Sequence, residues 1–355
     1  MATPEPAIAL MRERVRAASA AGRPLRLRGA GTKDFYGESL EGEVLELGSH
    51  QGILAYDPAE LVVTARCGTP LSQLEAVLAA SGQFLPFEPP AFAGDPTLGG
   101  VIAAGLSGPR RMYAGAARDF VLGATLLGAD GELLRFGGQV MKNVAGFDVA
   151  RALCGSLGIL GIITEVSLKV LPLPRQEATL RLELTLEEAC SAFERWAGRP
   201  LPLSAAAWHG GRAWVRLSGA APAVQAACAS LGGESVPPAA AREWWTALRH
   251  CRLPLFAQPQ LWRLSLPGAS GPLPQLPPPL LVDWGGALRW YAAEAGHDFR
   301  SAAAAVGGTA LCWRGPAPAG RFHPLTAATL ALHQRLKQRL DPRGIFNPGR
   351  LVRGL

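Results

Sequence analysis

Two glycine-rich segments of this chain have residue types that suit a backbone turn around a phosphate. The first reads Arg28-Gly-Ala-Gly-Thr-Lys33, in which two glycines free the backbone and the last two residues add hydrogen-bond donors. The second runs from Gly94 to Gly100, where Asp95-Pro96 favours a turn and Gly99-Gly100 lets a ligand or another segment approach closely. Consecutive N–H groups in such turns can point at one anion.

Glycines continue beyond the second turn, at Gly105, Gly108 and Gly115, in an apolar segment that extends to Pro174. The residues between them are mainly Val, Ile, Leu and Ala, which is not the composition of a linker. The segment indicates backbone that is packed in a core and brought close to a large, flat ligand, with a dinucleotide as the leading candidate. The alternative is a glycine-rich loop with solvated arginines. Two such segments in one chain, both flanked by apolar strands, weaken that alternative.

The spacing of the glycines excludes two common nucleotide-binding motifs. In a G-x-G-x-x-G fingerprint that begins at Gly29, the third glycine position holds Asp34, so the turn is not of the Rossmann type. The chain also contains no G-x-x-x-x-G-K-[ST] sequence, which excludes a P-loop nucleotidase.

Short strands and helices must position these turns. Apolar residues at helical spacing predict helices over 6–21, 71–80, 148–154, 186–196, 221–231 and 325–340, and a short helix or tight turn over 98–106. Alternation and short apolar runs predict strands over 24–29, 44–47, 61–67, 120–128, 132–136, 161–170, 179–184, 213–217 and 281–285. All nine tryptophans lie at or beyond Trp196. The strand–helix–strand–helix order after residue 174 predicts a second unit of α+β type.

Charge and cysteine usage limit the classes of partner. The formal net charge of +7 comes mostly from arginine and favours anionic partners. The basic residues form no long run, so we expect no nucleic-acid binding. The six cysteines show no C-x-x-C spacing, so we expect reduced thiols and no metal or iron–sulfur cluster on this chain. We expect no secretory signal and no membrane span, hence a cytoplasmic protein, with peripheral association at the inner face of the membrane left open.

Six segments in this order resemble the FAD-binding domain of the vanillyl-alcohol-oxidase family, also called the PCMH type. They are 28–33, 94–100, 113–119, 140–148, 155–164 and 346–350. Within that family, the chain resembles most the smaller, FAD-binding subunits of bacterial glycolate oxidases. The resemblance implies an α+β fold with a two-part PCMH-type domain over 1–175, its parts being about 1–48 and 49–175. A small, reduced α+β cap over 176–324 and a C-terminal segment over 325–355, which returns to the FAD domain, complete the expected organisation.

The resemblance also implies a site for FAD. The 29–33 turn would hold the pyrophosphate, and segments 97–100 and 105–108 would lie along the pyrophosphate, ribitol and ring. Gly155 and 159–163 would contact the adenosine half by backbone. Lys142-Asn143 would lie near the ribityl chain or ring, and Asn347 would return towards the flavin. The full implied set is Arg28, Gly29, Ala30, Gly31, Thr32, Lys33, Asp95, Thr97, Leu98, Gly99, Gly100, Gly105, Ser107, Gly108, Arg118, Asp119, Lys142, Asn143, Gly155, Gly161, Ile162, Ile163 and Asn347.

Two features bear on chemistry beyond binding. Some relatives attach FAD covalently through a histidine near the first turn or through a cysteine. Here that turn holds no histidine, and Cys67 and Cys154 have apolar surroundings, so we expect non-covalent FAD. The H-x-G-D-G-N-x-H type motif of the larger catalytic flavin subunits is absent, so catalytic residues stay unassigned. Trp208-His209-Gly-Gly211 is the best candidate, with Arg212 and Arg216 nearby for a carboxylate, and a solvated strand face is the alternative.

Three functions remain open. The first is an FAD-binding subunit of a complex that oxidises glycolate to glyoxylate together with a larger catalytic flavin subunit and an iron–sulfur subunit. The second is a stand-alone FAD-dependent dehydrogenase of a small 2-hydroxy acid. The third is a structural subunit with a vestigial FAD site, whose tryptophan-rich surface serves only assembly.

Overall fold

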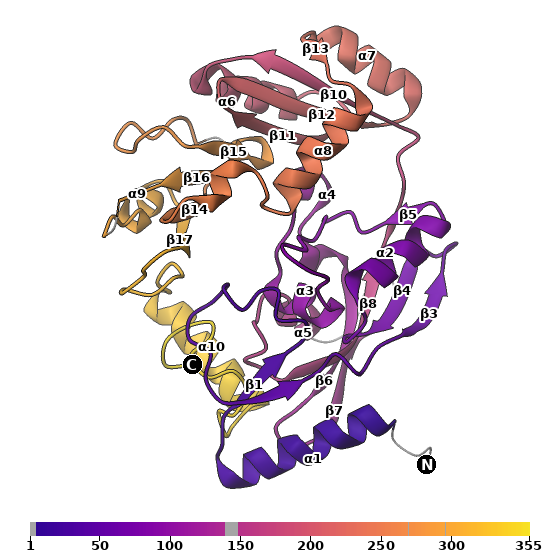
Figure 1. Ribbon diagram of the computed structural model, residues 1–355, viewed down its shortest axis with the longest axis vertical. Helices are drawn as coiled ribbons and strands as arrows, with labels where there is room; N and C mark the ends of the chain where they lie inside the picture. Colours follow the sequence, from indigo (N-terminus) through magenta and orange to yellow (C-terminus); the bar gives the residue numbers. More distant parts are fainter. Residues whose placement is uncertain (1–4, 139–147, 269, 295) are drawn as a thin grey trace.

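A computed structural model describes residues 5–138, 148–268, 270–294 and 296–355 of the chain. The N-terminal half is built on an antiparallel sheet with the strand order β3-β4-β8-β6-β7, in the lower part of Figure 1. Its strands are β3 (Ile53–Asp57), β4 (Val62–Arg66), β6 (Val121–Leu127), β7 (Leu133–Gly137) and β8 (Ile162–Lys169). The sequence predicts each of these strands except β3.

Helices α2 (Leu71–Ala80) and α3 (Leu98–Ala104) pack on this sheet and form the main core of the N-terminal half. Leu71, Leu74 and Leu78 recur at helical spacing on α2 and are almost wholly buried, as are Val101 and Ile102 of α3. The predicted helix over 71–80 is confirmed. Shorter elements complete this half, namely β5 (Gln83–Phe84), α4 (Arg111–Ala114), η1 (Ala117–Phe120), α5 (Val149–Leu153) and β9 (Leu171–Pro172).

The two ends of the chain meet at the parallel strand pair β1 (Leu25–Arg28) and β2 (Glu43–Glu46). Helix α1 (Pro6–Ala21) packs against this pair through Met11 and Val15, as its spacing predicts. The segment that follows α10 (Ala327–Leu340) adds to β1, because Leu25 N donates to Ile345 O at 2.7 Å and Asn347 N donates to Leu25 O at 2.9 Å. Figure 1 shows the C-terminus and α10 beside β1.

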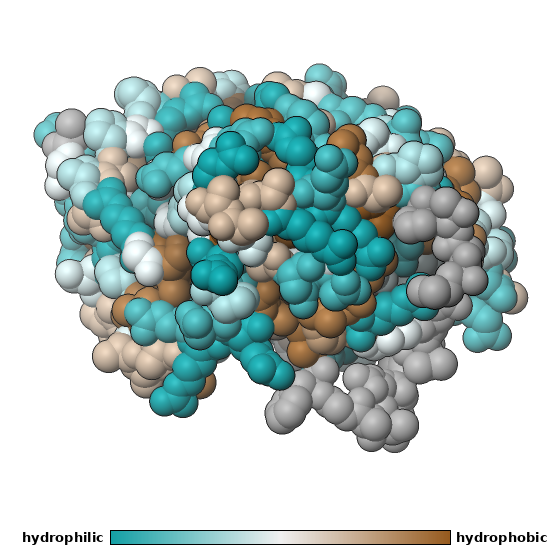
Figure 2. All heavy atoms as spheres, turned by 90° about the horizontal axis from the view of Figure 1, so that it is seen from below, coloured by the Kyte–Doolittle hydropathy of each residue, from teal (hydrophilic) through white to brown (hydrophobic). Residues whose placement is uncertain are grey.

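The surface at the α1 end of the molecule is mainly polar. Hydrophilic residues cover most of that face in Figure 2, and hydrophobic residues lie between them in smaller areas. Arg16 of α1, for example, pairs with Glu132 at 2.8 Å. In the described ranges, no helix is both long and apolar enough to cross a membrane.

Residues 176–314 form a second antiparallel sheet in the order β13-β10-β12-β11-β15-β16-β14-β17. Its strands are β10 (Gln176–Glu183), β11 (Leu203–His209), β12 (Arg212–Gly219), β13 (Glu234–Ser235), β14 (Leu261–Ser265), β15 (Leu281–Asp283), β16 (Leu288–Ala292) and β17 (Thr309–Arg314). The helices here are α6 (Leu186–Ala197), α7 (Ala221–Leu231), α8 (Pro238–Arg249) and α9 (Arg300–Ala305), with η2 (Pro254–Ala257) and η3 (Trp284–Gly286). The expected α+β class is confirmed, although the sequence does not predict β11, β13, β14, β16, β17, α8 or α9.

Buried charges join this large sheet to the N-terminal half. Glu88, in the segment after β5, lies 2.9 Å from Arg216 of β12 and 3.4 Å from Arg110. Arg110 also pairs with Glu177 of β10 at 2.8 Å. Burial alone would raise the pKa of Glu88, but Arg216 and Arg110 outweigh it and hold the pKa below its ordinary value. The carboxylate therefore stays charged and fixes the two halves to each other.

Candidate functional site

A glycine-lined cavity lies where the N-terminal half meets the C-terminal segment. The space between its walls is about 930 Å³, open solvent included. Parts of 27–34, 97–104 and 157–164 line it, together with Asn347 and Arg350. Of the residues that the resemblance implies, the cavity brings together Arg28, Gly29, Ala30, Gly31, Thr32, Lys33, Thr97, Gly99, Gly100, Gly161, Ile162, Ile163 and Asn347.

The 29–33 turn presents unpaired backbone donors to this cavity. Within the described part of the chain, none of the five N–H groups from Gly29 to Lys33 donates to a protein acceptor. All five residues line the cavity. Four of the five residues are partly buried, and Ala30 is exposed. Because partly buried N–H groups are normally paired, this run of free donors marks a site for an external acceptor. Successive N–H groups of this kind suit a phosphate.

Glycine at position 29 lets this turn contact the start of α3. A Cβ on Gly29 would lie 2.2 Å from Thr97 Oγ1. That oxygen accepts a hydrogen bond from Gly100 N at 3.3 Å and so caps α3. The contact therefore couples the position of the turn to the position of the helix.

Residues 97–100 shape the cavity but offer it few free donors. Leu98 N donates to Thr69 O at 2.8 Å, and Gly99 N donates to Cys67 O at 2.7 Å. Leu98 is fully buried in the core and does not line the cavity. A Cβ on Gly99 would lie 2.9 Å from Cys67 Cβ, so glycine is needed here for packing against Cys67.

Gly105 and Gly155 lie outside the cavity lining and contact each other. A Cβ on Gly105 would lie 2.9 Å from Gly155 N. Gly155 N donates to Ile102 O at 3.0 Å, and Leu157 N donates to Ala103 O at 2.8 Å. The two glycines thus hold α3 against the loop before β8, and their implied contact with the cofactor stays a prediction.

Asn347 joins three segments at the cavity. Its Oδ1 accepts from Leu27 N, and its Nδ2 donates to Leu157 O, both at 2.7 Å. Its φ of 41° is left-handed, a conformation that asparagine tolerates better than most residues. A Cβ on Gly158 would lie 2.8 Å from Nδ2. Both polar atoms of the side chain are engaged in hydrogen bonds to the protein, so Asn347 positions the segments that line this cavity.

Arg350 is a lining residue that the sequence reading misses. Its guanidinium donates to Glu38 O at 2.9 Å, Lys33 O at 3.1 Å and Asp34 O at 2.9 Å, and so holds the loop that follows the 29–33 turn. Burial lowers its pKa to about 10, which still leaves it charged at neutral pH. The one feature of the sequence that could have indicated Arg350 is its position three residues after Asn347, in the same C-terminal turn.

A buried ion pair fixes α10 to this wall of the site, and the sequence reading misses it as well. Lys337 Nζ lies 2.7 Å from Asp341 Oδ2 and also donates to Ile159 O at 2.7 Å and Phe346 O at 2.9 Å. Asp341 accepts in turn from the N–H groups of Ile345 and Phe346. All three donors of the ammonium are used.

Lys33 carries a charge in the cavity that no carboxylate of the described residues neutralises within ion-pair distance. Its ammonium lies 3.4 Å from Thr32 Oγ1 and 5.7 Å from the centre of the Phe92 ring. Burial lowers its pKa to about 8. A half-desolvated cation without an acidic partner favours an anionic ligand beside it.

The other implied residues that the structure describes do not line this cavity. Asp95 accepts from Ser72 N at 3.1 Å, at the start of α2. Asp119 accepts from Ala116 N at 2.8 Å and closes the turn before β6, while Arg118 beside it is exposed. Ser107 and Gly108 line a second cavity. Lys142 and Asn143 lie outside the described residues.

The His209 segment forms a hairpin outside the lining of the glycine-lined cavity, and its interpretation as a substrate site stays a prediction. Gly210 and Gly211, with φ of 58° and 79°, form the turn between β11 and β12. His209 Nδ1 lies 2.7 Å from Leu280 O. Arg212 pairs with Glu183 at 2.7 Å, and Arg216 is the buried partner of Glu88. Each candidate side chain is therefore engaged in holding the sheet.

The residues of the glycine-lined cavity fit FAD. The cavity offers free N–H groups and a cation for the pyrophosphate, and mostly apolar residues elsewhere. Cys67 lines it, but burial raises the pKa of this thiol above its ordinary range, so the sulfur is not a thiolate nucleophile. Cys154, at the end of α5, does not line it.

Known proteins agree with this assignment. A family model described as an FAD binding domain matches residues 8–137. Alkyldihydroxyacetonephosphate synthase superimposes with a TM-score of 0.66 at 14% identity, over 96% of this chain and 75% of the synthase chain, which shows a shared fold. The fold and the cavity thus define an FAD-binding oxidoreductase of the PCMH type.

Two relatives place the chain more narrowly. Glycolate oxidase subunit GlcE of Escherichia coli (strain K12) is 47% identical over 330 residues, which are 92% of this chain and 92% of that protein. Glycolate oxidase subunit GlcD of Bacillus subtilis (strain 168) is 35% identical over 44% of this chain and 34% of its own length. The chain belongs to the family of glycolate oxidase subunits that GlcE represents.

Proposed function

We propose that this chain is the FAD-binding subunit of a complex that oxidises glycolate to glyoxylate. The observation that carries the proposal is the run of free N–H groups over 29–33, in a chain that is 47% identical to a glycolate oxidase subunit over 92% of its length. FAD supplies the acceptor of two electrons that oxidation of a CH–OH group requires.

In this proposal, the 29–33 turn binds the pyrophosphate through its N–H groups, and the Lys33 ammonium adds a charge. Thr97, Gly99 and Gly100 shape the adjoining wall, and the backbone of Gly161 to Ile163 contacts the adenosine half. Residues 1–175 and 325–355 hold the cofactor, and 176–324 form the cap. The relatives' names support a multi-subunit assembly. We infer as partners a larger catalytic flavin subunit and an iron–sulfur subunit, in the cytoplasm or at the inner face of the membrane.

Purification of the full chain with and without its partner subunits tests this function. We expect a flavin spectrum from the chain alone, with FAD released into the supernatant when the protein is denatured. A chain that stays colourless and takes up no added FAD would overturn the proposal. Bleaching of the flavin by glycolate in the absence of any partner would instead identify a stand-alone dehydrogenase.

The affinity for FAD is expected to fall as pH rises through about 8, the pKa to which burial lowers Lys33. Only the protonated ammonium attracts phosphate, so its contribution is complete below that pH and is lost above it. One charge-assisted hydrogen bond contributes about 1.5–3 kcal/mol, which is roughly 10–100-fold in Kd. Quenching of flavin fluorescence between pH 7 and pH 10 measures the change.

Lys33→Arg is the matched control, because a guanidinium stays charged over this whole pH range. We expect the Kd of this variant to stay flat where that of the wild type rises. Equal pH profiles for the two proteins would show that Lys33 does not contact the phosphates.

A further inference from the structure

A second cavity lies between the N-terminal half and the large sheet, and we call it the interface cavity. The space between its walls is about 380 Å³, open solvent included. Leu106 to Pro109, parts of 248–251, and Arg263, Asp283 and Trp290 of the large sheet line it. Segment 97–109 runs from the glycine-lined cavity into this one, because α3 borders the first and Leu106 to Pro109 border the second. A small molecule in the interface cavity would therefore lie beside the proposed cofactor site.

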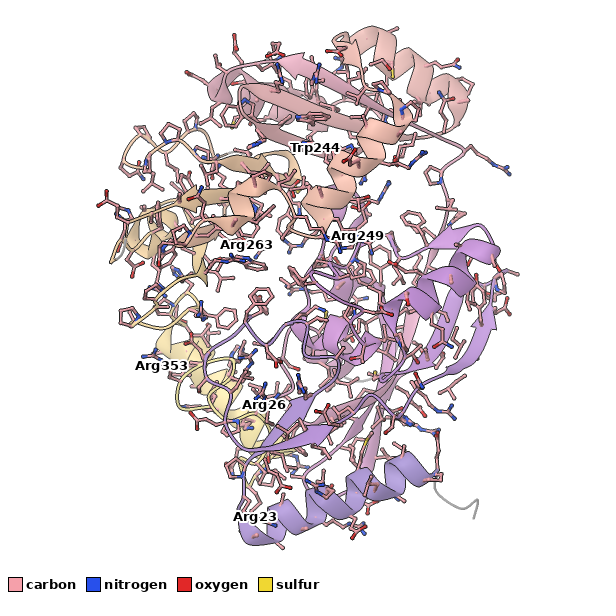
Figure 3. All side chains as sticks on the ribbon, in the orientation of Figure 1. Arg23, Arg26, Trp244, Arg249, Arg263 and Arg353 are labelled. Atoms are coloured by element: carbon pink, nitrogen blue, oxygen red, sulfur yellow. The ribbon has the colours of Figure 1, made fainter. Side chains whose placement is uncertain are left out.

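Arg263 of β14 brings an unpaired charge to the interface cavity. Among the described residues, its guanidinium has neither a hydrogen bond nor an ion pair, and its neighbours are the rings of Trp284 at 5.0 Å and Trp290 at 5.9 Å. Figure 3 shows this side chain directed from the large sheet into the space between the two halves. Other buried arginines are fully engaged, as in the bonds of Arg289 to three backbone carbonyls. A desolvated guanidinium without a partner marks a site for an anion.

A second arginine strengthens the positive potential there. Arg111 of α4 lies 4.2 Å from the centre of the same Trp284 ring. Burial, and then the neighbouring Arg263, lower its pKa to about 10. Burial lowers the pKa of Arg263 as well. In the described part of the chain, neither arginine has a carboxylate within ion-pair distance.

Asp283 of β15 faces the same cavity with one free oxygen. Its Oδ1 accepts from Trp284 N at 2.7 Å, and its Oδ2 has no hydrogen-bond partner among the described residues. Arg263 and Asp283 line one cavity and yet do not approach within the 4.0 Å of an ion pair. Burial raises the pKa of Asp283 to about 7, so this carboxyl is poised between its two forms near neutral pH.

Two other polar groups of the cavity are engaged or inert, but Trp290 Nε1 is buried and has no hydrogen-bond partner among the described residues. Arg249 pairs with Glu75 and donates to Pro89 O. Burial raises the pKa of Cys251 to about 12, so it stays a thiol. Arg263, Asp283 and the Trp290 N–H are therefore free to contact a ligand, as a cation, a hydrogen-bond acceptor and a hydrogen-bond donor.

We propose that the interface cavity binds a small 2-hydroxy carboxylate, with Arg263 paired to the carboxylate and Asp283 Oδ2 accepting a hydrogen bond from the 2-hydroxyl group. The inference rests on the proposed function, because it places the substrate of that oxidation on this chain. A guanidinium recognises the planar carboxylate, and the aspartate supplies the acceptor that distinguishes a hydroxy acid from a simple acid.

Equilibrium dialysis with the FAD-loaded full chain tests the proposal, with the flavin reduced beforehand so that no oxidation occurs. The probes are glycolate and acetate, which differ by the hydroxyl group. We expect glycolate to bind more tightly, by about tenfold for one hydrogen bond to a charged group. Arg263→Met is expected to weaken both probes at least about tenfold. Asp283→Asn, which turns an amide nitrogen to the cavity, is expected to bring the ratio of the two Kd values towards one.

Arg212→Met, at an exposed ion pair of the same sheet, is the matched control and should bind both probes as the wild type does. Arg263→Lys keeps a positive charge and provides a second test if Arg263→Met does not fold. We expect this variant to bind both probes with an affinity between those of the wild type and Arg263→Met. Wild-type affinity for glycolate in either Arg263 variant, or an unchanged preference in Asp283→Asn, would overturn the inference. A wild-type chain that holds FAD but binds neither probe would overturn it and leave the proposed function standing, whereas a chain without FAD would refute that function itself.

Discussion

Lys337→Met is expected to destabilise the chain by about 3–5 kcal/mol, the usual cost of leaving one partner of a buried ion pair alone. Methionine keeps the length of the side chain but removes the ammonium, so Asp341 stays buried without a cation and the carbonyls of Ile159 and Phe346 lose their donor. The C-terminal turn that carries Asn347 then loosens, and the proportion of protein that retains FAD should fall sharply. Urea unfolding followed by tryptophan fluorescence, with the FAD content of the purified protein, measures both effects.

Arg339→Met provides the control on the same helix. Arg339 is exposed and lies two residues further along α10, so its replacement should change the free energy of unfolding by no more than about 0.5 kcal/mol. An unfolding midpoint for Lys337→Met equal to that of Arg339→Met would mean that the buried pair does not stabilise the C-terminal segment.

The two halves of the fold differ in how far the sequence predicts them. Helices such as α1 and α2 are strongly periodic, because one face packs on a sheet and the other meets water, and their bounds are predicted correctly. Strands β14 and β16 instead carry Arg263 and Arg289 among their apolar residues. Arg289 is wholly buried and is satisfied by carbonyls of residues 270, 271 and 286. The carbonyls that accept these hydrogen bonds lie outside the strand. Within the strand, the sequence therefore shows only an arginine that interrupts the apolar pattern of a buried strand.

The residues of the candidate site also differ in how far the sequence predicts them. The 29–33 turn is a local arrangement and can be predicted from its residue types. Arg350 reaches Lys33 O across 317 residues of sequence, and Lys337 meets Ile159 O across 178, so no local pattern indicates either contact. The glycines mark close approach correctly, but composition does not say what approaches. In the structure, the partner of Gly105 is Gly155, a second segment of the chain.

Gly29→Ala is expected to lower the affinity for FAD at least about tenfold and to destabilise the fold by about 1–3 kcal/mol, as overpacking of a close contact does. The added Cβ would lie 2.2 Å from Thr97 Oγ1, so either the turn or the start of α3 must move. If the turn moves, its free N–H groups no longer converge. If Thr97 moves, it loses its bond to Gly100 N and α3 loses its cap. Titration with FAD and urea unfolding separate the two effects.

Two further variants show whether this contact is the cause. Gly48→Ala lies just beyond β2, where an added Cβ meets no atom within 4 Å, and it should bind FAD as the wild type does. Thr97→Ala removes the oxygen that the new methyl group would strike and leaves only Cβ, at 3.2 Å. Introduced together with Gly29→Ala, it should recover part of the lost affinity relative to Thr97→Ala alone. If no affinity returns although the double variant unfolds like Thr97→Ala, then glycine at 29 is required by the ligand and not by Thr97, because the methyl group would stand where FAD itself approaches the backbone.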